Sequence, residues 1–372
     1  MNDKPILILN DSNCFVEYAK RKTIEKSKIE HYDGIICPGF VNAHCHLELS
    51  HMKGLIAEKS GLLNFAKEII TKRRAFQKEE IQSAIVNADK FMWENGTVAV
   101  GDISNTVDSF DVKQKSPLFY HTFLELIGFD PEQAEYVFAM GKELQRGASR
   151  ADLKNSLVPH APYSVSDALM EKISSDVRDT KFPLSIHNQE HADEDLFFKS
   201  KEGIFTELYE FLKINISHFE SGKPSSLQSY LPHLSPAKNL LLVHNTFTKK
   251  EDIKWAKRFH EELFWCLCPN ANLYIENILP NLKNFVEENC KMVIGTDSLA
   301  SNKSLSMVSE INALLKNFNW VQIADVLKWA TYNGAEALGI ENKFGTFIKG
   351  KNAGINHLSY TPDKLIFEGK LA

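Results

Sequence analysis

The chain has 372 residues, which is more than one average domain but within the size range of a single α/β barrel. Hydrophobic residues make up 43% and charged residues 24%, and 43 basic against 48 acidic side chains give a net charge of −5. This balance excludes the basic footprint of a nucleic-acid-binding protein. The first residues do not open a signal peptide, no apolar run is long enough to span a bilayer, and the six cysteines show no paired spacing. We therefore predict a cytoplasmic protein with neither a nucleic-acid nor a membrane partner.

Short apolar segments at the two ends of the chain predict a small β domain. Residues 5–9 and 14–18 are expected to form antiparallel strands joined by the turn sequence Asn-Asp-Ser-Asn, and residues 345–350 and 355–360 have a similar pattern. We predict that residues 1–36 and 345–372 together form a β-sandwich layer beside the main domain, which spans residues 37–344.

Eight apolar runs follow one another through the main domain, separated by stretches with helical spacing. The runs cover residues 35–46, 97–104, 118–128, 156–160, 182–187, 240–244, 263–270 and 291–297. The helical stretches cover residues 62–95, 131–146, 166–178, 249–260, 280–290 and 304–317, the first ending at Asn95 and Gly96. This alternation predicts a parallel sheet, and eight units in about three hundred residues favour a TIM-like (β/α)₈ barrel.

A doubly wound open sheet is the alternative architecture. The barrel is favoured because polar residues fall at the ends of nearly every run, and in a barrel these ends surround one mouth. Residues 191–238 form the longest interval between runs, and both a lid and a homodimer contact are open interpretations of this insertion.

The first run ends in His44-Cys45-His46, and residues two apart in a strand point to the same side. His187 ends the fifth run and Asp297 the eighth, so all four side chains would meet at the mouth. Catalytic zinc takes about three protein ligands and leaves a position open for water. Imidazole and carboxylate groups suit zinc or iron rather than magnesium or calcium.

Three further residues at the expected mouth suit acid–base or binding roles. Glu190 lies just past a strand end, where it could transfer a proton without binding the metal. His160 and His244 end the fourth and sixth runs and could orient water or hydrogen-bond a substrate. One histidine at a strand end is more often a simple polar cap, but several ligand-type residues ending separate runs are hard to explain as caps. Asp102 and Glu125 also close runs, and for them capping or loop bonding is the favoured interpretation.

The motifs resemble those of the amidohydrolase superfamily, within it the chlorohydrolase and nucleobase or nucleoside deaminase group. The resemblance rests on six motifs: Pro-Gly-Phe-Val-Asn-Ala-His44-Cys-His46, Pro-His160-Ala-Pro-Tyr-Ser, His187-x-x-Glu190, Val-His244-Asn, Cys-Pro-Asn270-Ala-Asn272 and Gly-Thr-Asp297-Ser. The resemblance implies metal ligands at His44, His46, His187 and Asp297, with Asp297 also serving catalysis. It further implies proton transfer by Glu190, water or intermediate stabilisation by His244 and substrate contact by His160.

The same resemblance favours one divalent ion, zinc over iron. Two-metal members carry a bridging lysine at the end of the fourth strand, where this chain has His160, and Lys154 lies at the start of that strand.

The function that these patterns favour is hydrolytic deamination of an amino-substituted heterocycle, with release of ammonia. Hydrolysis of another bond, such as the C–Cl bond of a triazine or a ring amide, is the alternative, and a non-catalytic scaffold is a third. The sequence leaves the small-molecule substrate open among purines, pyrimidines and adenosine-type nucleosides.

Overall fold

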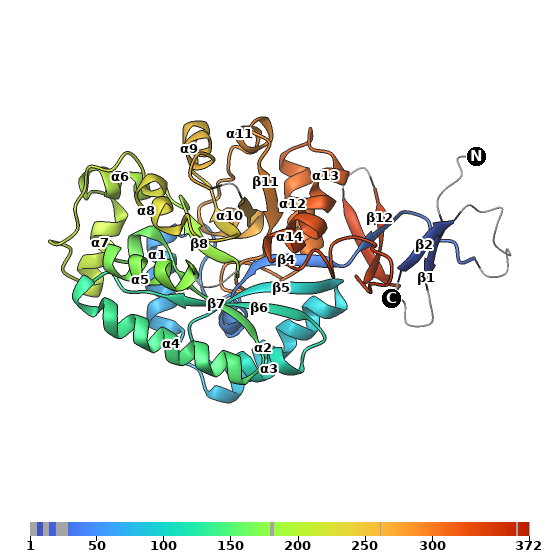
Figure 1. Ribbon diagram of the computed structural model, residues 1–372, viewed down its shortest axis with the longest axis horizontal. Helices are drawn as coiled ribbons and strands as arrows, with labels where there is room; N and C mark the ends of the chain where they lie inside the picture. Colours follow the sequence, from blue (N-terminus) through green and yellow to red (C-terminus); the bar gives the residue numbers. More distant parts are fainter. Residues whose placement is uncertain are drawn as a thin grey trace.

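Eight parallel strands surrounded by helices form the centre of the molecule in this computed structural model (Figure 1), which describes residues 6–9, 15–19, 29–178, 182–260, 262–361 and 364–371. The strands form two four-stranded sheets, ordered β4-β5-β6-β7 and β8-β9-β10-β11. Their bounds are β4 Phe40–Cys45, β5 Thr97–Ser104, β6 Phe119–Leu126, β7 Lys154–Pro159, β8 Leu184–Asn188, β9 Leu240–His244, β10 Leu263–Leu267 and β11 Lys291–Ile294. All eight predicted strands and their alternation with helices are confirmed, but the first run is interrupted at Gly39, and its first part, Ile35–Pro38, belongs to a separate sheet.

Two seams join these sheets into a barrel. At one seam the backbone N–H of His187 donates to the carbonyl of His160, just beyond β7, at 2.9 Å. At the other, the backbone N–H groups of Thr296 and Asp297, which follow β11, donate to the carbonyl of His44 in β4 at 2.9 and 3.1 Å. Closure at both edges excludes the doubly wound open sheet.

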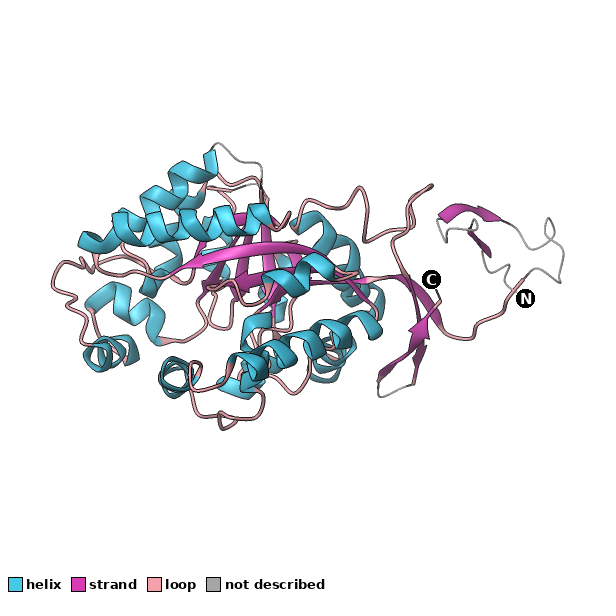
Figure 2. Cartoon of the chain, turned by 90° about the horizontal axis from the view of Figure 1, so that it is seen from below, coloured by secondary structure: helices cyan, strands magenta, loops and turns pink. Residues whose placement is uncertain are grey.

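Helices pack around the outside of the barrel (Figure 2). Their bounds are α1 Leu62–Lys72, α2 Lys78–Glu94, α3 Phe110–Lys115, α4 Ala134–Arg150, α5 Asp167–Arg178, α9 Lys250–Ala256, α10 Pro269–Ile275, α11 Leu282–Glu287, α12 Met307–Asn317, α13 Ile323–Lys328 and α14 Gly334–Ala337. The amphipathic stretch 62–95 forms two helices, and the second ends where predicted, with Gly96 in a left-handed conformation. None of the helices in the described part of the chain is long and apolar enough to cross a membrane.

The insertion 191–238 contributes three helices, α6 Asp193–Ser200, α7 Ile204–Leu212 and α8 Ser226–Leu234. Aromatic side chains from α6 and α7, with Phe129 and Tyr163, form a hydrophobic cluster separate from the main core. In that cluster the rings of Phe129 and Tyr209 stack with centroids 4.6 Å apart. The insertion therefore packs against residues outside it through a hydrophobic cluster that is separate from the main core.

Strands from both ends of the chain form an antiparallel sheet at one end of the molecule (Figure 1). This sheet has the order β13-β12-β3, with β3 at Ile35–Pro38, β12 at Ile355–Tyr360 and β13 at Leu365–Lys370. The strands β1 (Ile6–Leu9) and β2 (Phe15–Ala19) pair with each other, and the predicted turn at residues 10–13 lies outside the described residues. The domain boundaries proposed above stay a prediction.

The predicted strand at residues 345–350 is wrong. Gly345 and Gly350 adopt positive φ angles of 85° and 77°, which turn the chain away from an extended path. Backbone hydrogen bonds still attach this segment to β2, because Gly350 donates to Phe15 and Phe15 donates to Lys351. The strand that the sequence analysis missed is β13.

The close approach of β11 and β4 generates a prediction for Gly295. A Cβ atom at Gly295 would lie 2.7 Å from the Cβ atom and 2.8 Å from the carbonyl oxygen of His44. Gly295→Ala should therefore lower the free energy of unfolding by about 1–3 kcal/mol, as other overpacked sites do. Gly147 in α4 is the matched control, since its added Cβ would meet only Phe110, at 3.7 Å. Gly147→Ala should raise the free energy of unfolding by about 0.5–1 kcal/mol. Denaturant titration measures both, and equal effects would contradict the argument.

Candidate metal centre

Imidazole and carboxylate groups from separate strand ends meet at the mouth of the barrel. The Nε2 atoms of His44 and His46, at the end of β4, lie 3.1 Å apart. Oδ1 of Asp297, just after β11, lies 3.5 and 3.4 Å from these two nitrogens. Ligand-type atoms of His44, His187, His244 and Asp297 all lie within 4.8 Å of one another. The structure thus brings together every residue that the sequence analysis proposed as a ligand.

The spacing of these atoms fits a divalent cation. Four ligands placed tetrahedrally at about 2.0–2.1 Å from zinc lie about 3.3–3.4 Å from one another. The distances of 3.1–3.5 Å among His44, His46 and Asp297 match this value. Burial lowers the pKa of His46 to about 4, so its ring is neutral and can donate a lone pair. His244 also faces these side chains. Five side chains therefore surround a site at which a zinc ion takes about four ligands.

Neighbouring groups fix the orientation of His187 and Asp297. Nδ1 of His187 donates to the carbonyl of His160 at 2.7 Å, so the proton is on Nδ1 and the Nε2 lone pair is free. The hydroxyl of Ser301 donates to Oδ2 of Asp297, which leaves Oδ1 facing His44 and His46. Partners of this kind are typical of side chains that bind metals.

His244 and Glu190 form a pair beside the candidate ligands. Nδ1 of His244 lies 2.9 Å from Oδ1 of Asn272, and the amide nitrogen of Asn272 donates to Thr246. The amide is therefore oriented to accept the Nδ1 proton, and Nε2 of His244 points toward Oε1 of Glu190 at 3.5 Å. Burial raises the pKa of Glu190 above its ordinary value. Asn272 belongs to the Cys-Pro-Asn-Ala-Asn motif, but nothing in the motif distinguishes it as a partner of His244.

His160 lies on the wall of the site and is held by a carboxylate that the sequence analysis assigned to capping. Nδ1 of His160 lies 2.6 Å from Oε1 of Glu125, and Asn105 donates to Oε2 of the same carboxylate at 2.9 Å. Burial opposes the charged form of His160, but Glu125 outweighs it and raises the pKa of the imidazole. Glu125 is the residue before the last of β6, and this place near a strand end is the one sequence signal that could have identified it. Asp102, by contrast, does act as a cap, since it accepts from the backbone N–H of Leu47, the first residue of a 3₁₀ helix.

The backbone is strained at this mouth. Gln189, His244, Asn245 and Asp297 have positive φ angles of 44°, 71°, 58° and 55°, which residues other than glycine rarely adopt. Such conformations persist only where the surrounding structure enforces them, and they cluster at functional sites. The strain supports the view that these side chains are placed for a function.

A cavity of about 330 Å³ opens directly onto these groups. One wall carries His46, His160, His187, Glu190 and Asp297. Apolar side chains of α1 and α7 also line the cavity, namely Leu62, Phe65, Ile69, Leu208 and Leu212. Lys154, the lysine noted in the fourth predicted strand, begins β7 and so lies at the other end of that strand from His160. The cavity has the mixed lining of a small-molecule site.

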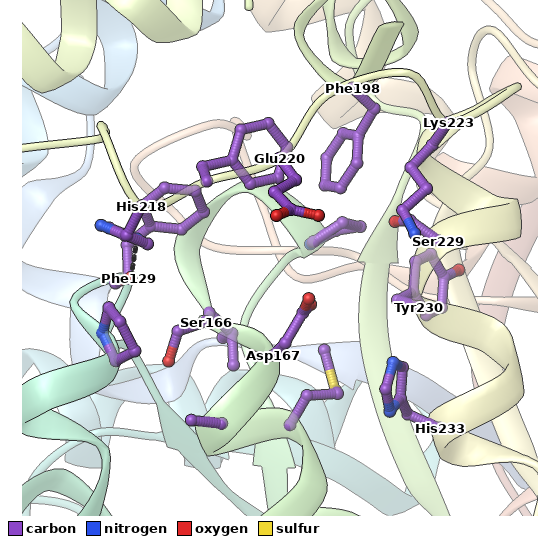
Figure 3. Close-up of a pocket in the computed structure, with 16 residues that line it drawn as sticks. Phe129, Ser166, Asp167, Phe198, His218, Glu220, Lys223, Ser229, Tyr230 and His233 are labelled. Carbon is purple, nitrogen blue, oxygen red and sulfur yellow. Dashed lines mark hydrogen bonds between the residues drawn. The ribbon is translucent and has the colours of Figure 1, made fainter.

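A second cavity, of about 190 Å³, lies between α5, α8 and the loop after α7 (Figure 3). Phe129 lines both cavities, and Nε2 of His218 donates to its carbonyl at 2.9 Å. Figure 3 shows Asp167 and Glu220 on facing sides of this space. None of the residues predicted for the site lines it.

Comparisons with known proteins agree with this geometry. The sequence model of the Amidohydrolase family matches residues 35–371. An adenosine deaminase of Helicobacter pylori is 30% identical over 316 residues, which cover 83% of this chain and 76% of the relative. A 5′-deoxyadenosine deaminase of Methanococcus maripaludis is 24% identical, over 94% of this chain and 86% of the relative.

A solved crystal structure has a similar fold over nearly the whole chain. The crystal structure of Helicobacter pylori aminofutalosine deaminase in complex with methylthio-coformycin superposes with a TM-score of 0.82 at 27% identity. The match covers 96% of this chain and 88% of that one.

The geometry predicts one tightly bound divalent ion per chain. His187→Ala and Asp297→Ala should each lose that ion, because each removes a ligand from a group of about four. Asn270→Ala, at a residue bonded to Glu310 rather than to the site, is the control and should keep it. Elemental analysis of the purified proteins measures the content. Two ions per chain in the wild type, or a full ion in both ligand variants, would contradict the site as described.

Proposed function

The chain belongs to the amidohydrolase family, and from this premise we propose that it is a metal-dependent hydrolytic deaminase of adenine nucleosides. One observation carries the proposal: the Glu190–His244 pair lies beside the convergent group of His44, His46 and Asp297, and both residues of the pair line a largely apolar cavity. This arrangement offers an ion, an acid–base group and room for an organic ring in one place. Relatives of this chain named as deaminases of adenosine and 5′-deoxyadenosine support the choice of reaction.

We assign His44, His46, His187 and Asp297 to a single divalent ion, with zinc favoured over iron. When bound, the ion would act as a Lewis acid and make water acidic enough to react near neutral pH. Ser301 and the carbonyl of His160 hold two of the four ligands in the orientation that this assignment requires. The first task of these side chains is therefore to hold the ion without rearrangement.

Glu190 is the acid–base group in this proposal. Its buried carboxylate takes a proton from the attacking water and gives one to a ring nitrogen of the substrate. The oxygen of the water adds to the ring carbon that carries the amine. The second proton of the water passes from the added hydroxyl to the exocyclic amine, the bond from the ring carbon to that nitrogen breaks, and ammonia leaves as the oxygen forms a carbonyl. The raised pKa of Glu190 helps, because the carboxyl must hold the proton between these two transfers.

His244 and His160 serve binding and stabilisation. Asn272 holds the Nδ1 proton of His244, so Nε2 faces Glu190 and the place where oxygen adds to the ring. Glu125 occupies Nδ1 of His160, so the remaining nitrogen is the one available to the substrate. With its raised pKa, His160 can donate a hydrogen bond to a ring or ribose group.

The apolar side chains of α1 and α7 limit what the substrate can carry away from its reacting ring. Arg73 lines the cavity, but its guanidinium pairs with the buried Glu48 at 2.8 Å. We propose that the far end of the substrate is uncharged, since burying an unpaired charge against these apolar side chains would be costly. Adenosine and 5′-deoxyadenosine both satisfy this condition, whereas a nucleotide does not.

Ammonia release from a panel of compounds tests the proposal. Adenosine and 5′-deoxyadenosine should be deaminated, and adenosine 5′-monophosphate, guanine and cytosine should react at least about a hundredfold more slowly in kcat/KM. A hundredfold difference in kcat/KM corresponds to about 2.7 kcal/mol of transition-state stabilisation. Chloride release from a chlorotriazine with no deamination of any nucleoside would replace the proposal with its alternative.

Glu190→Gln should keep the metal and lower kcat by about 10²–10⁴-fold, because the amide fills the same space but cannot transfer a proton. Metal content and kcat should be measured on the same preparation. A variant that is folded but free of metal would show that Glu190 is a ligand, and unchanged kcat would remove it from the mechanism.

His160→Ala should lower kcat/KM by about 10–100-fold, since a lost buried hydrogen bond costs about 1–3 kcal/mol. Glu125→Gln should lower it less, because the histidine remains and only its charge partner changes. Metal content should stay at the wild-type level in both. A His160→Ala protein with normal kinetics and a lower melting temperature would make this residue a structural cap.

A further inference from the structure

A buried ion pair joins α3 to β5, the strand that pairs with β4 next to His44 and His46. Nζ of Lys113, in α3, is 2.5 Å from Oδ2 of Asp102, near the end of β5, and neither side chain is exposed to solvent. Lys113 also donates to the hydroxyls of Ser104 at 2.8 Å and Thr122 at 3.3 Å. All three donors of the ammonium group are thus engaged.

The other oxygen of this carboxylate reaches across to β4. Oδ1 of Asp102 accepts from the backbone N–H of Leu47 at 2.7 Å. Leu47 follows His46 directly and begins the 3₁₀ helix η3 (Leu47–Met52). The residue before such a helix usually supplies the capping oxygen, but His46 makes no side-chain cap because its ring faces the metal site. Asp102 therefore caps η3 from the neighbouring strand and fixes the point at which β4 ends.

Stability alone does not account for this pair. Taking two charges out of water offsets most of their attraction, and well-packed apolar residues often replace such pairs without loss of stability. An acceptor oxygen is nevertheless needed for the backbone N–H of Leu47, and Oδ1 of Asp102 supplies it. The lysine holds the side chain that carries this acceptor, because it engages Oδ2 while Leu47 engages Oδ1.

We propose that Asp102, held by Lys113, is a positioning residue that sets the direction of His46 toward the metal ion. The inference rests on the metal site of the proposed function and adds two residues that touch neither metal nor substrate. Groups that orient metal ligands from behind typically change metal affinity by about 10–100-fold when they are removed.

Two double variants separate positioning from charge burial. In Lys113→Met with Asp102→Asn, both charges are gone, but the amide oxygen can still accept from Leu47 while its nitrogen faces the hydroxyl of Ser104. In Lys113→Met with Asp102→Leu, the charges and the acceptor are both gone, and the side-chain volume is similar. Zinc affinity is measured on metal-stripped protein by competition with a chelator, together with the melting temperature of the metal-free form.

The first double variant should bind zinc within about threefold of the wild type, and the second should bind it about 10–100-fold more weakly. Equal affinities in the two variants, with only the melting temperature changed, would overturn the proposal and make the pair structural. The control replaces a remote ion pair, Lys142 with Asp176, by methionine and asparagine, and should leave zinc affinity unchanged. Wild-type protein that binds no zinc would refute the proposed function itself, which is a different outcome.

Discussion

The backbone hydrogen bonds that close the barrel are made by the same residues whose side chains meet at its mouth. His187 bonds to His160 across one seam, and Asp297 bonds to His44 across the other. A shift of one strand against its neighbour would therefore break a seam and separate the polar groups in the same movement. The closure of the barrel and the geometry of the site are one constraint, which explains why the site can be assembled from residues more than two hundred positions apart in the chain.

That constraint has a local cost that the rest of the fold offsets. Four residues without the freedom of glycine adopt positive φ angles at the mouth, and such positions cost about 1–3 kcal/mol each. Buried capping groups hold the same region in place, among them Asp102 on Leu47 and Asn272 on His244. On the outer side, α1 and α7 add an apolar wall supported by its own aromatic cluster. Rigid polar groups thus face an apolar space, which is the arrangement that favours reaction of an organic ring with water.

Much of this could be predicted from the sequence, because the signals were local. Strand-like runs ending in His44, His187 and Asp297 predicted both the barrel and the convergence of their side chains, since parallel strands share one end. The turn at Gly345 and the strand β13 could not be predicted as well, because glycine conformations and the pairing with β12 depend on tertiary contacts.

The hydrogen-bond partners of the predicted residues could not be predicted from the sequence either. Glu125 looked like a capping group and no role was expected of Asn272, because a hydrogen bond between distant segments has no pattern in one chain. Capping or loop bonding was expected of Asp102, and it does cap a helix, but only the structure shows that this helix begins directly after His46.

The most direct test of this account is X-ray absorption at the zinc K-edge on protein loaded with one equivalent of zinc. The account predicts a first shell of nitrogen and oxygen atoms at about 2.0–2.1 Å, with the outer-shell pattern of three imidazole rings. His46→Ala lacks one of the four ligands, so zinc added to this variant should not show the pattern of three rings. A shell that contains sulfur, such as Cys45, or one with no more than a single imidazole in the wild type, would contradict the claim that these strand ends form one metal site.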